Sequence, residues 1–118
     1  MIYVDGFPIP ILAGFTEEAY RVFADMEVPI FKDRGATRMV GGWGDHILHG
    51  IITEFYGAVQ VRDGETVAFS WMEWPDKASR DAGLKKAMED ARMQPSGEAI
   101  PLDGPRTVFD GFRAIVDR

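Results

Sequence analysis

The chain has 118 residues and a mass of 13.2 kDa, which fits one domain (1–118) with one modest hydrophobic core. It contains no cysteine, which excludes disulfides, thiolate metal sites and cysteine nucleophiles and is typical of a reducing compartment. The formal net charge of −6 disfavours nucleic acid as a partner, because attraction to phosphate needs the opposite sign. No apolar stretch approaches the roughly 20 residues that span a bilayer, and no secretory leader pattern is present. We therefore expect a cytoplasmic protein with no membrane partner.

The first expected element is a strand over residues 2–7, where β-branched and aromatic residues put apolar side chains on both faces. Pro8 and Pro10 follow, and their missing N–H groups point to the same side of the strand. Hydrogen-bonded pairing with a neighbouring strand must therefore stop on that side. We expect the paired strand to end near Phe7, with residues 9–12 as an extended exit.

A helix is expected next, from Thr16, a good N-cap, to the region of Gly35, a residue suited to stop it. Pro29 lies deep in this helix and removes one backbone hydrogen bond, so we expect a kink near Asp25. One helix face is apolar except at Glu27, and it carries Tyr20, Phe23, Met26, Ile30 and Phe31.

The rest of the chain is expected to form three more strands and one more helix. Asp76 offers the N-cap of that helix, and Gly83 weakens the helix by about 1 kcal/mol relative to Ala. Residues 51–63 are ambiguous, and we expect a loop with one short element there. The expected strands cover 37–43, 66–74 and 106–116, the helix covers 77–91, and 94–105 is a loop.

The resulting order, β-α-β-β-α-β, is that of the ferredoxin-like α+β fold. In this fold an antiparallel sheet carries two helices on one face, and the first and last strands lie side by side. Asp-Gly-Phe occurs in both of those strands, at 5–7 and at 110–112. We expect the two glycines to lie close together.

Strand 66–74 is apolar on both faces, with Phe69 and Trp71 on one and Met72 and Trp74 on the other. Two helices can cover only one face of the sheet, and an apolar face of that size on a monomer would be unusual. We therefore expect a homodimer, formed through the open face of the sheet, in the manner of a dimeric α/β barrel.

Several segments carry a resemblance to a known family: YVDGF at 3–7, PIFKDRGA at 29–36, WGD at 43–45, ETVAFSWMEWPDKASRDAG at 65–83 and MEDARM at 88–93. Together they resemble the YbaA-like family of small bacterial proteins of unknown function, within the dimeric α/β-barrel superfamily. The resemblance spans nearly the whole chain and implies a homodimer whose two sheets pack into a barrel. It also implies superfamily relatives that include cofactor-free monooxygenases and small isomerases. The sequence departs from the family pattern at His46 and His49.

The two histidines follow Asp45 in the pattern D-H-x-x-H, in which imidazoles three residues apart can share a metal ion. A third ligand would have to come from far away, so we predict no metal site and no cofactor. Exposed loop histidines are the simpler interpretation. A role for His46 as a general base, oriented by Asp45, stays open.

Aromatic side chains on the strands favour a pocket for a flat apolar ligand. The alternative is that they belong to the core and to the dimer interface. By itself Arg80 would be interpreted as an ordinary surface charge. The resemblance to the family makes it a candidate for ligand binding. The candidate ligand-binding residues are Tyr3, Trp43, Asp45, Trp71 and Arg80.

Three carboxylates, Asp5, Glu73 and Asp110, lie in otherwise apolar strands, where a charge must be at an edge, paired or in a pocket. Structural pairing and a polar site both stay open. The arginines that could neutralise these carboxylates are Arg38, Arg106 and Arg113.

Two functions from different classes fit these residues. The first is a homodimeric binding protein that holds a small apolar or aromatic molecule between its sheet and its helices. The second is a cofactor-independent, monooxygenase- or isomerase-like enzyme in which Asp5, His46, Glu73 or Asp110 moves a proton. A buried, unpaired carboxylate facing a cavity would favour the enzyme. An RNA-associated role is a third interpretation, which the net charge of −6 disfavours.

Overall fold

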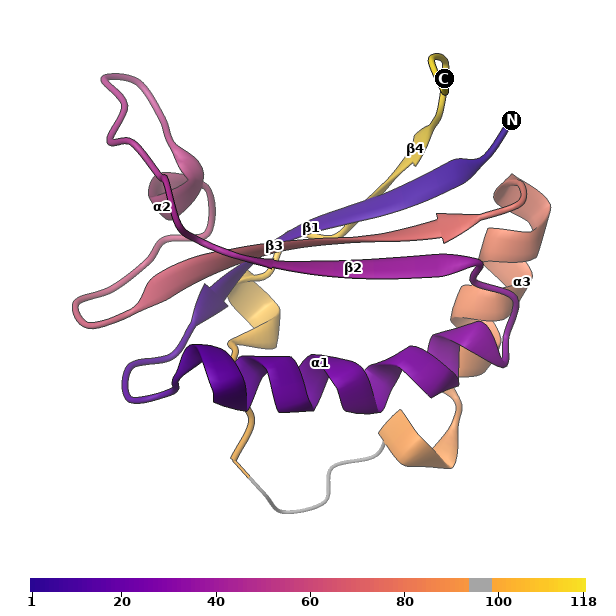
Figure 1. The fold of residues 1–118 in the computed structure, drawn as a ribbon, viewed down its shortest axis with the longest axis horizontal. Helices are drawn as coiled ribbons and strands as arrows, with labels where there is room; N and C mark the ends of the chain where they lie inside the picture. The colour runs from indigo at the N-terminus through magenta and orange to yellow at the C-terminus, as the bar shows by residue number, and fades with distance from the viewer. Residues whose placement is uncertain (94–98) are drawn as a thin grey trace.

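The computed structural model describes residues 1–93 and 99–118. Four strands form one antiparallel sheet in the order β2-β3-β1-β4, and α1 and α3 lie under one face of it (Figure 1). This is the expected ferredoxin-like arrangement, including the neighbouring first and last strands. The strands are β1 (Tyr3–Ile11), β2 (Arg38–Trp43), β3 (Thr66–Trp74) and β4 (Asp110–Arg113); the helices are α1 (Glu17–Lys32), α2 (Phe55–Ala58) and α3 (Lys77–Met88), with 3-10 turns at Ala91–Met93 and Gly104–Arg106.

The expected end of the first strand near Phe7 is wrong, because β1 stays paired with β3 as far as Ile11. The prolines explain how this is possible. The backbone N–H of Val108 donates to the carbonyl of Pro8, so the polar backbone groups of Pro8 and Pro10 face β4 and not β3. Pairing lapses only on the β4 side, as the spacing of the prolines predicts.

The expected fourth strand over 106–116 is also too long, since β4 covers only Asp110–Arg113. Its pairing with β1 is limited at one end by Pro8, which lacks a donor. At the other end Ala114 still donates to the carbonyl of Ile2, and β1 offers no partner beyond that point. In the register, Gly6 lies opposite Asp110 and Gly111 opposite Asp5, so the two glycines are diagonal neighbours.

The first helix begins as its sequence predicts. The backbone N–H of Ala19 donates to Oγ1 of Thr16 at 3.1 Å, and Gly35 adopts a positive φ of 110° where the chain leaves the helix. Pro29 lies inside α1, as expected. The kink near Asp25 stays a prediction.

The second long helix starts at its predicted cap, where Ser79 N–H donates to Oδ1 of Asp76 at 2.7 Å. It ends at Met88 and not near Ala91, where a separate 3-10 turn follows. The expected loop from 94 to 105 falls partly outside the described residues, and its described part contains the 3-10 turn at Gly104–Arg106. The short element expected within 51–63 is α2.

The core lies between the sheet and α1 and consists of two clusters that share contacts with Phe7. One cluster is centred on Trp74 and Met72, next to Ile30 and Phe31 of α1. The other is centred on Ile9, Ile11 and Ala68, next to Tyr20. As expected, alternate residues of β3 face opposite sides: Met72 and Trp74 are buried against the helices, while Phe69 remains 41% exposed on the other side.

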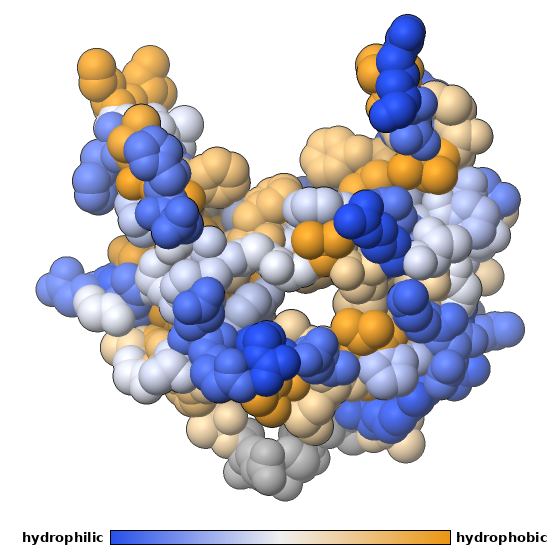
Figure 2. All heavy atoms as spheres, viewed as in Figure 1, coloured by the Kyte–Doolittle hydropathy of each residue, from blue (hydrophilic) through white to orange (hydrophobic). Residues whose placement is uncertain are grey.

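The face of the sheet opposite the helices is open and lies between two projections (Figures 1 and 2). One projection is the arm, residues 45–61, which includes α2 and exposes Leu48, Ile51 and Ile52. The other is the C-terminal segment, which exposes Ile115 and Val116. Among the described residues, no helix is both long and apolar enough to cross a lipid bilayer.

Candidate functional site

Asp5 sits at the centre of a buried ion pair. Its carboxylate is 0% exposed and accepts hydrogen bonds from Nη2 of Arg80 at 2.7 Å and from Nε of Arg80 at 3.0 Å. Nε1 of Trp74 donates to the other carboxylate oxygen at 2.9 Å. With these donors the charge of Asp5 is balanced inside the protein, which supports structural pairing rather than a proton-transfer role.

Tyr3 and Arg80, two of the candidate ligand-binding residues, do come together. The guanidinium of Arg80 lies 5.2 Å from the centre of the Tyr3 ring, a cation–π geometry. A methyl group at Gly111 of β4 would collide with the Tyr3 hydroxyl, so the glycine allows the ring to lie against the strand. The guanidinium of Arg80 already has protein partners, Asp5 and Tyr3. These contacts therefore do not indicate a ligand site at Arg80.

The other strand carboxylates lie on the open face. Glu73 accepts a hydrogen bond from Nε1 of Trp71 at 3.0 Å and lies 3.8 Å from Nη1 of Arg38. Asp110 lies at the edge of the same face, on β4. These groups line a shallow groove of about 520 Å³ formed by Ile2, Val4, Gly6, Pro8, Phe69, Trp71, Glu73, Val108, Asp110 and Phe112. Trp71 and Tyr3 therefore lie on opposite faces of the sheet.

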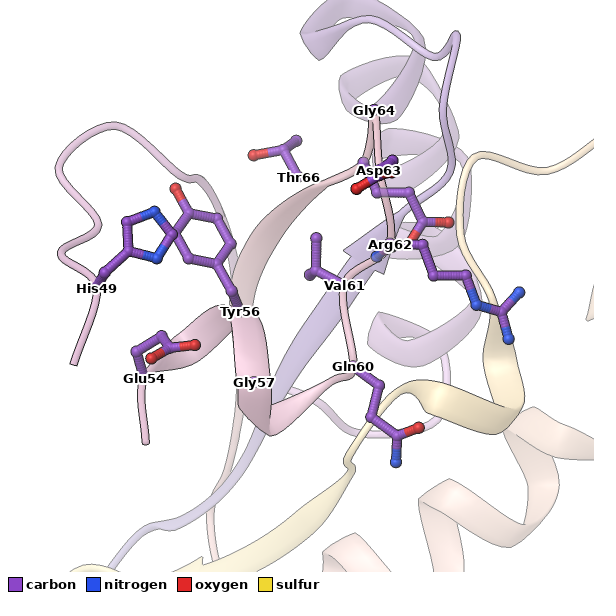
Figure 3. A pocket seen from close by; sticks show the side chains of 11 residues that line it. His49, Glu54, Tyr56, Gly57, Gln60, Val61, Arg62, Asp63, Gly64 and Thr66 are labelled. Carbon is purple, nitrogen blue, oxygen red and sulfur yellow. Dashed lines mark hydrogen bonds between the residues drawn. The ribbon is translucent and has the colours of Figure 1, made fainter. Parts of the chain in front are cut away.

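Asp45, His46 and His49 are exposed in the arm. The ring of His49 stacks on Tyr56 with centroids 5.1 Å apart, beside a polar depression that the end of the arm forms (Figure 3). No group of three or more potential metal ligands occurs in the part of the chain that the structure describes. That these histidines do not bind zinc tightly stays a prediction.

Glu27, which the sequence showed only as a break in an apolar stripe, is the unusual carboxyl group of this structure. It lies on the face of α1 that packs toward the sheet, between Ala24, which contacts one core cluster, and Ile30, which belongs to the other. Figure 2 shows a hollow that passes through the molecule between the sheet and α1. We call this hollow the chamber.

The surroundings of Glu27 disfavour its charged form. Burial raises the pKa of Glu27 to about 7 from an ordinary value of 4.5, and no hydrogen bond or cation among the described residues offsets this. Sequence reasoning had the signal for this site, since an acidic residue in an apolar helix stripe must be paired or face a cavity.

Tyr20 lies near Glu27 and is hydrogen-bonded to Ser70. The hydroxyl of Tyr20 and Oγ of Ser70 form a buried hydrogen bond of 2.8 Å. Burial and the nearby carboxyl of Glu27 both raise the pKa of Tyr20, whereas the bond to Ser70 lowers it. The Tyr20 ring lies 6.0 Å from that of Trp43, so this candidate aromatic residue belongs to the chamber side of the sheet.

The fold and these contacts define the class of the protein: a small ferredoxin-like α+β protein with a few polar groups in an otherwise apolar interior. A family model described as "Protein of unknown function (DUF1428)" matches residues 2–104. The chain belongs to this family. It is 43% identical over 117 residues to the "Uncharacterized protein YbaA" of Escherichia coli (strain K12) and to that of Shigella flexneri, covering 99% of each chain. The resemblance to YbaA-like proteins is thereby confirmed.

Two solved structures are similar more distantly. One is a dimeric ferredoxin-like protein from an uncultured marine organism, with a TM-score of 0.48, 14% identity and coverage of 98% of this chain and 96% of that one. The other is the de novo designed protein Foldit4, with a TM-score of 0.47, 10% identity and coverage of 97% and 99%. At such TM-scores the likeness says nothing about the assembly or activity of this chain.

Proposed function

We propose that this protein works as a homodimer in which each subunit holds a small apolar or aromatic molecule in the chamber between the sheet and α1. The observation that supports the proposal most strongly is the half-buried carboxyl of Glu27, which has no hydrogen-bond or ion-pair partner within residues 1–93 and 99–118 and lies in an apolar surrounding. Binding sites for small molecules combine a mostly apolar wall with a few polar groups that fix orientation. Tyr20, Ser70 and Glu27 supply such groups here.

The dimer is supported by the open face of the sheet. Phe69, Val108 and Phe112 are 41%, 41% and 61% exposed there, and the two projections flank them (Figure 2). Burying each such side chain fully is worth about 1.5 to 3 kcal/mol. A second copy that met the same face would remove this apolar surface from water on both subunits.

The arm and the C-terminal segment flank the open face at its two ends (Figure 1). The arm exposes Leu48, Ile51 and Ile52 at the border of this face, where they could reach a partner.

A cofactor-independent enzyme is the second candidate, and one observation favours it. A general base works best when its pKa lies near the working pH, and burial brings the pKa of Glu27 to about 7. In this version Glu27 replaces Asp5, His46, Glu73 and Asp110 as the residue that moves a proton. An RNA-associated role is still disfavoured by the net charge of −6, because binding to phosphates requires positive charge.

The chamber is tested by an NMR titration with n-propylbenzene, a neutral aromatic probe. We expect saturable shifts of the backbone amides of Tyr20, Glu27 and Ser70, because Tyr20 and Glu27 lie on α1 and Ser70 lies on β3, the elements on either side of the chamber. Gly41→Val should weaken the shifts, since a Cβ at Gly41 would lie in ordinary contact with Oγ of Ser70, 3.5 Å away, and the rest of the side chain would take up space on the chamber side of the sheet. Shifts confined to the open face, or none at all, would refute the proposed binding site.

A further inference from the structure

All but one of the buried and half-buried carboxylates among the described residues have a hydrogen-bond or ion-pair partner in the protein. Asp5 is paired with Arg80, Asp90 with Arg34 and Arg92, and Glu65 and Asp103 with Arg106. Glu73 accepts from Trp71, and Glu54 accepts from the backbone of Gly50. Within residues 1–93 and 99–118, Glu27 is the one carboxyl of this group that no protein donor satisfies. Figure 2 shows the chamber between the sheet and α1, the helix that carries Glu27.

The residues around Glu27 indicate which chemical class of ligand could be its partner. Tyr20 and Trp43 place aromatic rings 6.0 Å apart on the chamber side of the sheet, and aromatic faces attract cations. An anionic ligand would be repelled by Glu27, and a purely apolar ligand would leave the carboxyl unsatisfied. A cation that donates hydrogen bonds suits both the carboxylate and the rings.

We propose that the molecule held in the chamber is a small aromatic or aliphatic amine whose ammonium group pairs with the carboxylate of Glu27. This inference rests on the proposed small-molecule site and adds the chemical class of the ligand. Pairing with the ammonium keeps Glu27 ionised, and the apolar part of the ligand fills the chamber beside Tyr20. Glu27 is then a ligand-binding residue in its own right.

The test compares three probes of similar shape in NMR titrations at about pH 8, where Glu27 is mostly ionised. They are 2-phenylethylamine, n-propylbenzene, in which a methyl group replaces the ammonium, and 3-phenylpropionate. We expect the amine to bind at least tenfold more tightly than n-propylbenzene and the carboxylate not to bind. In Glu27→Gln the amine should lose this advantage while n-propylbenzene still binds.

Met26→Gln is the matched control, because Met26 precedes Glu27 on α1 and is 66% exposed. It should leave the binding of all three probes unchanged. Equal binding of the amine and n-propylbenzene to the wild-type protein would overturn the amine proposal and leave the chamber intact as a binding site. Failure of all probes to bind would overturn both proposals.

A second measurement applies even if Glu27→Gln does not fold. The carboxyl carbon of Glu27 in the wild-type protein can be titrated by NMR with and without 2-phenylethylamine. Pairing with an ammonium should move the titration of Glu27 to lower pH. A titration curve that the amine leaves unmoved would contradict the proposed contact.

Discussion

Asp5 and Arg80 are 75 positions apart in the sequence, and their side chains form a two-pronged ion pair that joins β1 to α3. The carboxylate is fully buried, and Trp74 of β3 supplies a further hydrogen bond to it. Three elements thus meet at one charge. The contact joins α3 to the sheet and balances the charge of Asp5 inside the protein.

Asp5→Asn should strongly destabilise the protein, because it leaves the guanidinium of Arg80 inside the fold without its counter-charge. Breaking a buried pair by changing one partner costs about 3 to 5 kcal/mol. Urea unfolding measures this loss. Asp81→Asn, which removes only the half-exposed second partner of Arg80, is the control and should cost far less. A small loss for Asp5→Asn would show that the ion pair does not hold α3.

Gly83→Ala should destabilise the protein although alanine is the better helix former. Helix propensity alone predicts a gain of about 1 kcal/mol. In the structure, however, an added Cβ would collide with the backbone carbonyl of Arg34 and with the ring of Trp74. Lys86→Ala, at an exposed position of the same helix, is the control for urea unfolding. A stabilised Gly83→Ala protein would mean that α3 lies farther from Arg34 and Trp74 than described.

Glu27 should make the protein less stable as the pH rises. The folded state holds a proton on Glu27 up to about pH 7, whereas the unfolded chain releases it near 4.5. Stability should therefore fall between these pH values and level off above them. At about pH 8, Glu27→Gln should raise the free energy of unfolding by up to about 3 kcal/mol, since one pKa unit corresponds to about 1.4 kcal/mol. Equal slopes of stability against pH in both proteins would contradict the raised pKa.

Glu65 should act in the opposite direction at acid pH. The guanidinium of Arg106, 2.7 Å away, lowers the pKa of Glu65 to about 2. The unfolded chain takes up a proton near the ordinary value of 4.5, so the stabilisation from this pair is lost as the pH falls from there toward 2. Thermal unfolding of Glu65→Gln between these pH values should show a weaker dependence on pH than the wild type. An unchanged dependence would rule out this pair as a source of acid sensitivity.

The fold was largely predictable because local signals and the global arrangement agree. Thr16 and Asp76 cap the helices that they precede, and the alternation along β3 assigns its two faces correctly. Proline contributes to both errors in strand length, at the end of β1 and at the end of β4 that lies beside Pro8. A proline shows that pairing fails on one side of a strand, but only the tertiary structure shows which neighbour lies on that side.

The site was harder to predict because burial depends on contacts between distant elements. Tyr3 and Arg80, two candidate ligand-binding residues, contact each other, but Trp71 lies on the opposite face of the sheet. The sequence makes Asp5 a candidate for proton transfer, and only the tertiary structure shows its partners Arg80 and Trp74. Nothing in the linear sequence shows that Glu27, on a surface helix, lacks such a partner.

Phe69→Asp should separate the proposed dimer. Phe69 is 41% exposed on the open face, so a charge there would be buried between two subunits without a partner. Size-exclusion chromatography with light scattering should show a monomer or an associating, poorly soluble species. Met26→Asp, a charge on an exposed position of α1, should leave the wild-type mass unchanged. A Phe69→Asp protein that keeps the wild-type dimer would move the interface away from the open face.

Sedimentation equilibrium of the wild-type protein at micromolar concentration tests the proposed assembly most directly. Burial of the open face against a second copy predicts a mass of about twice 13.2 kDa that does not fall on dilution through this range. A stable, well-behaved species of 13.2 kDa would contradict the homodimer.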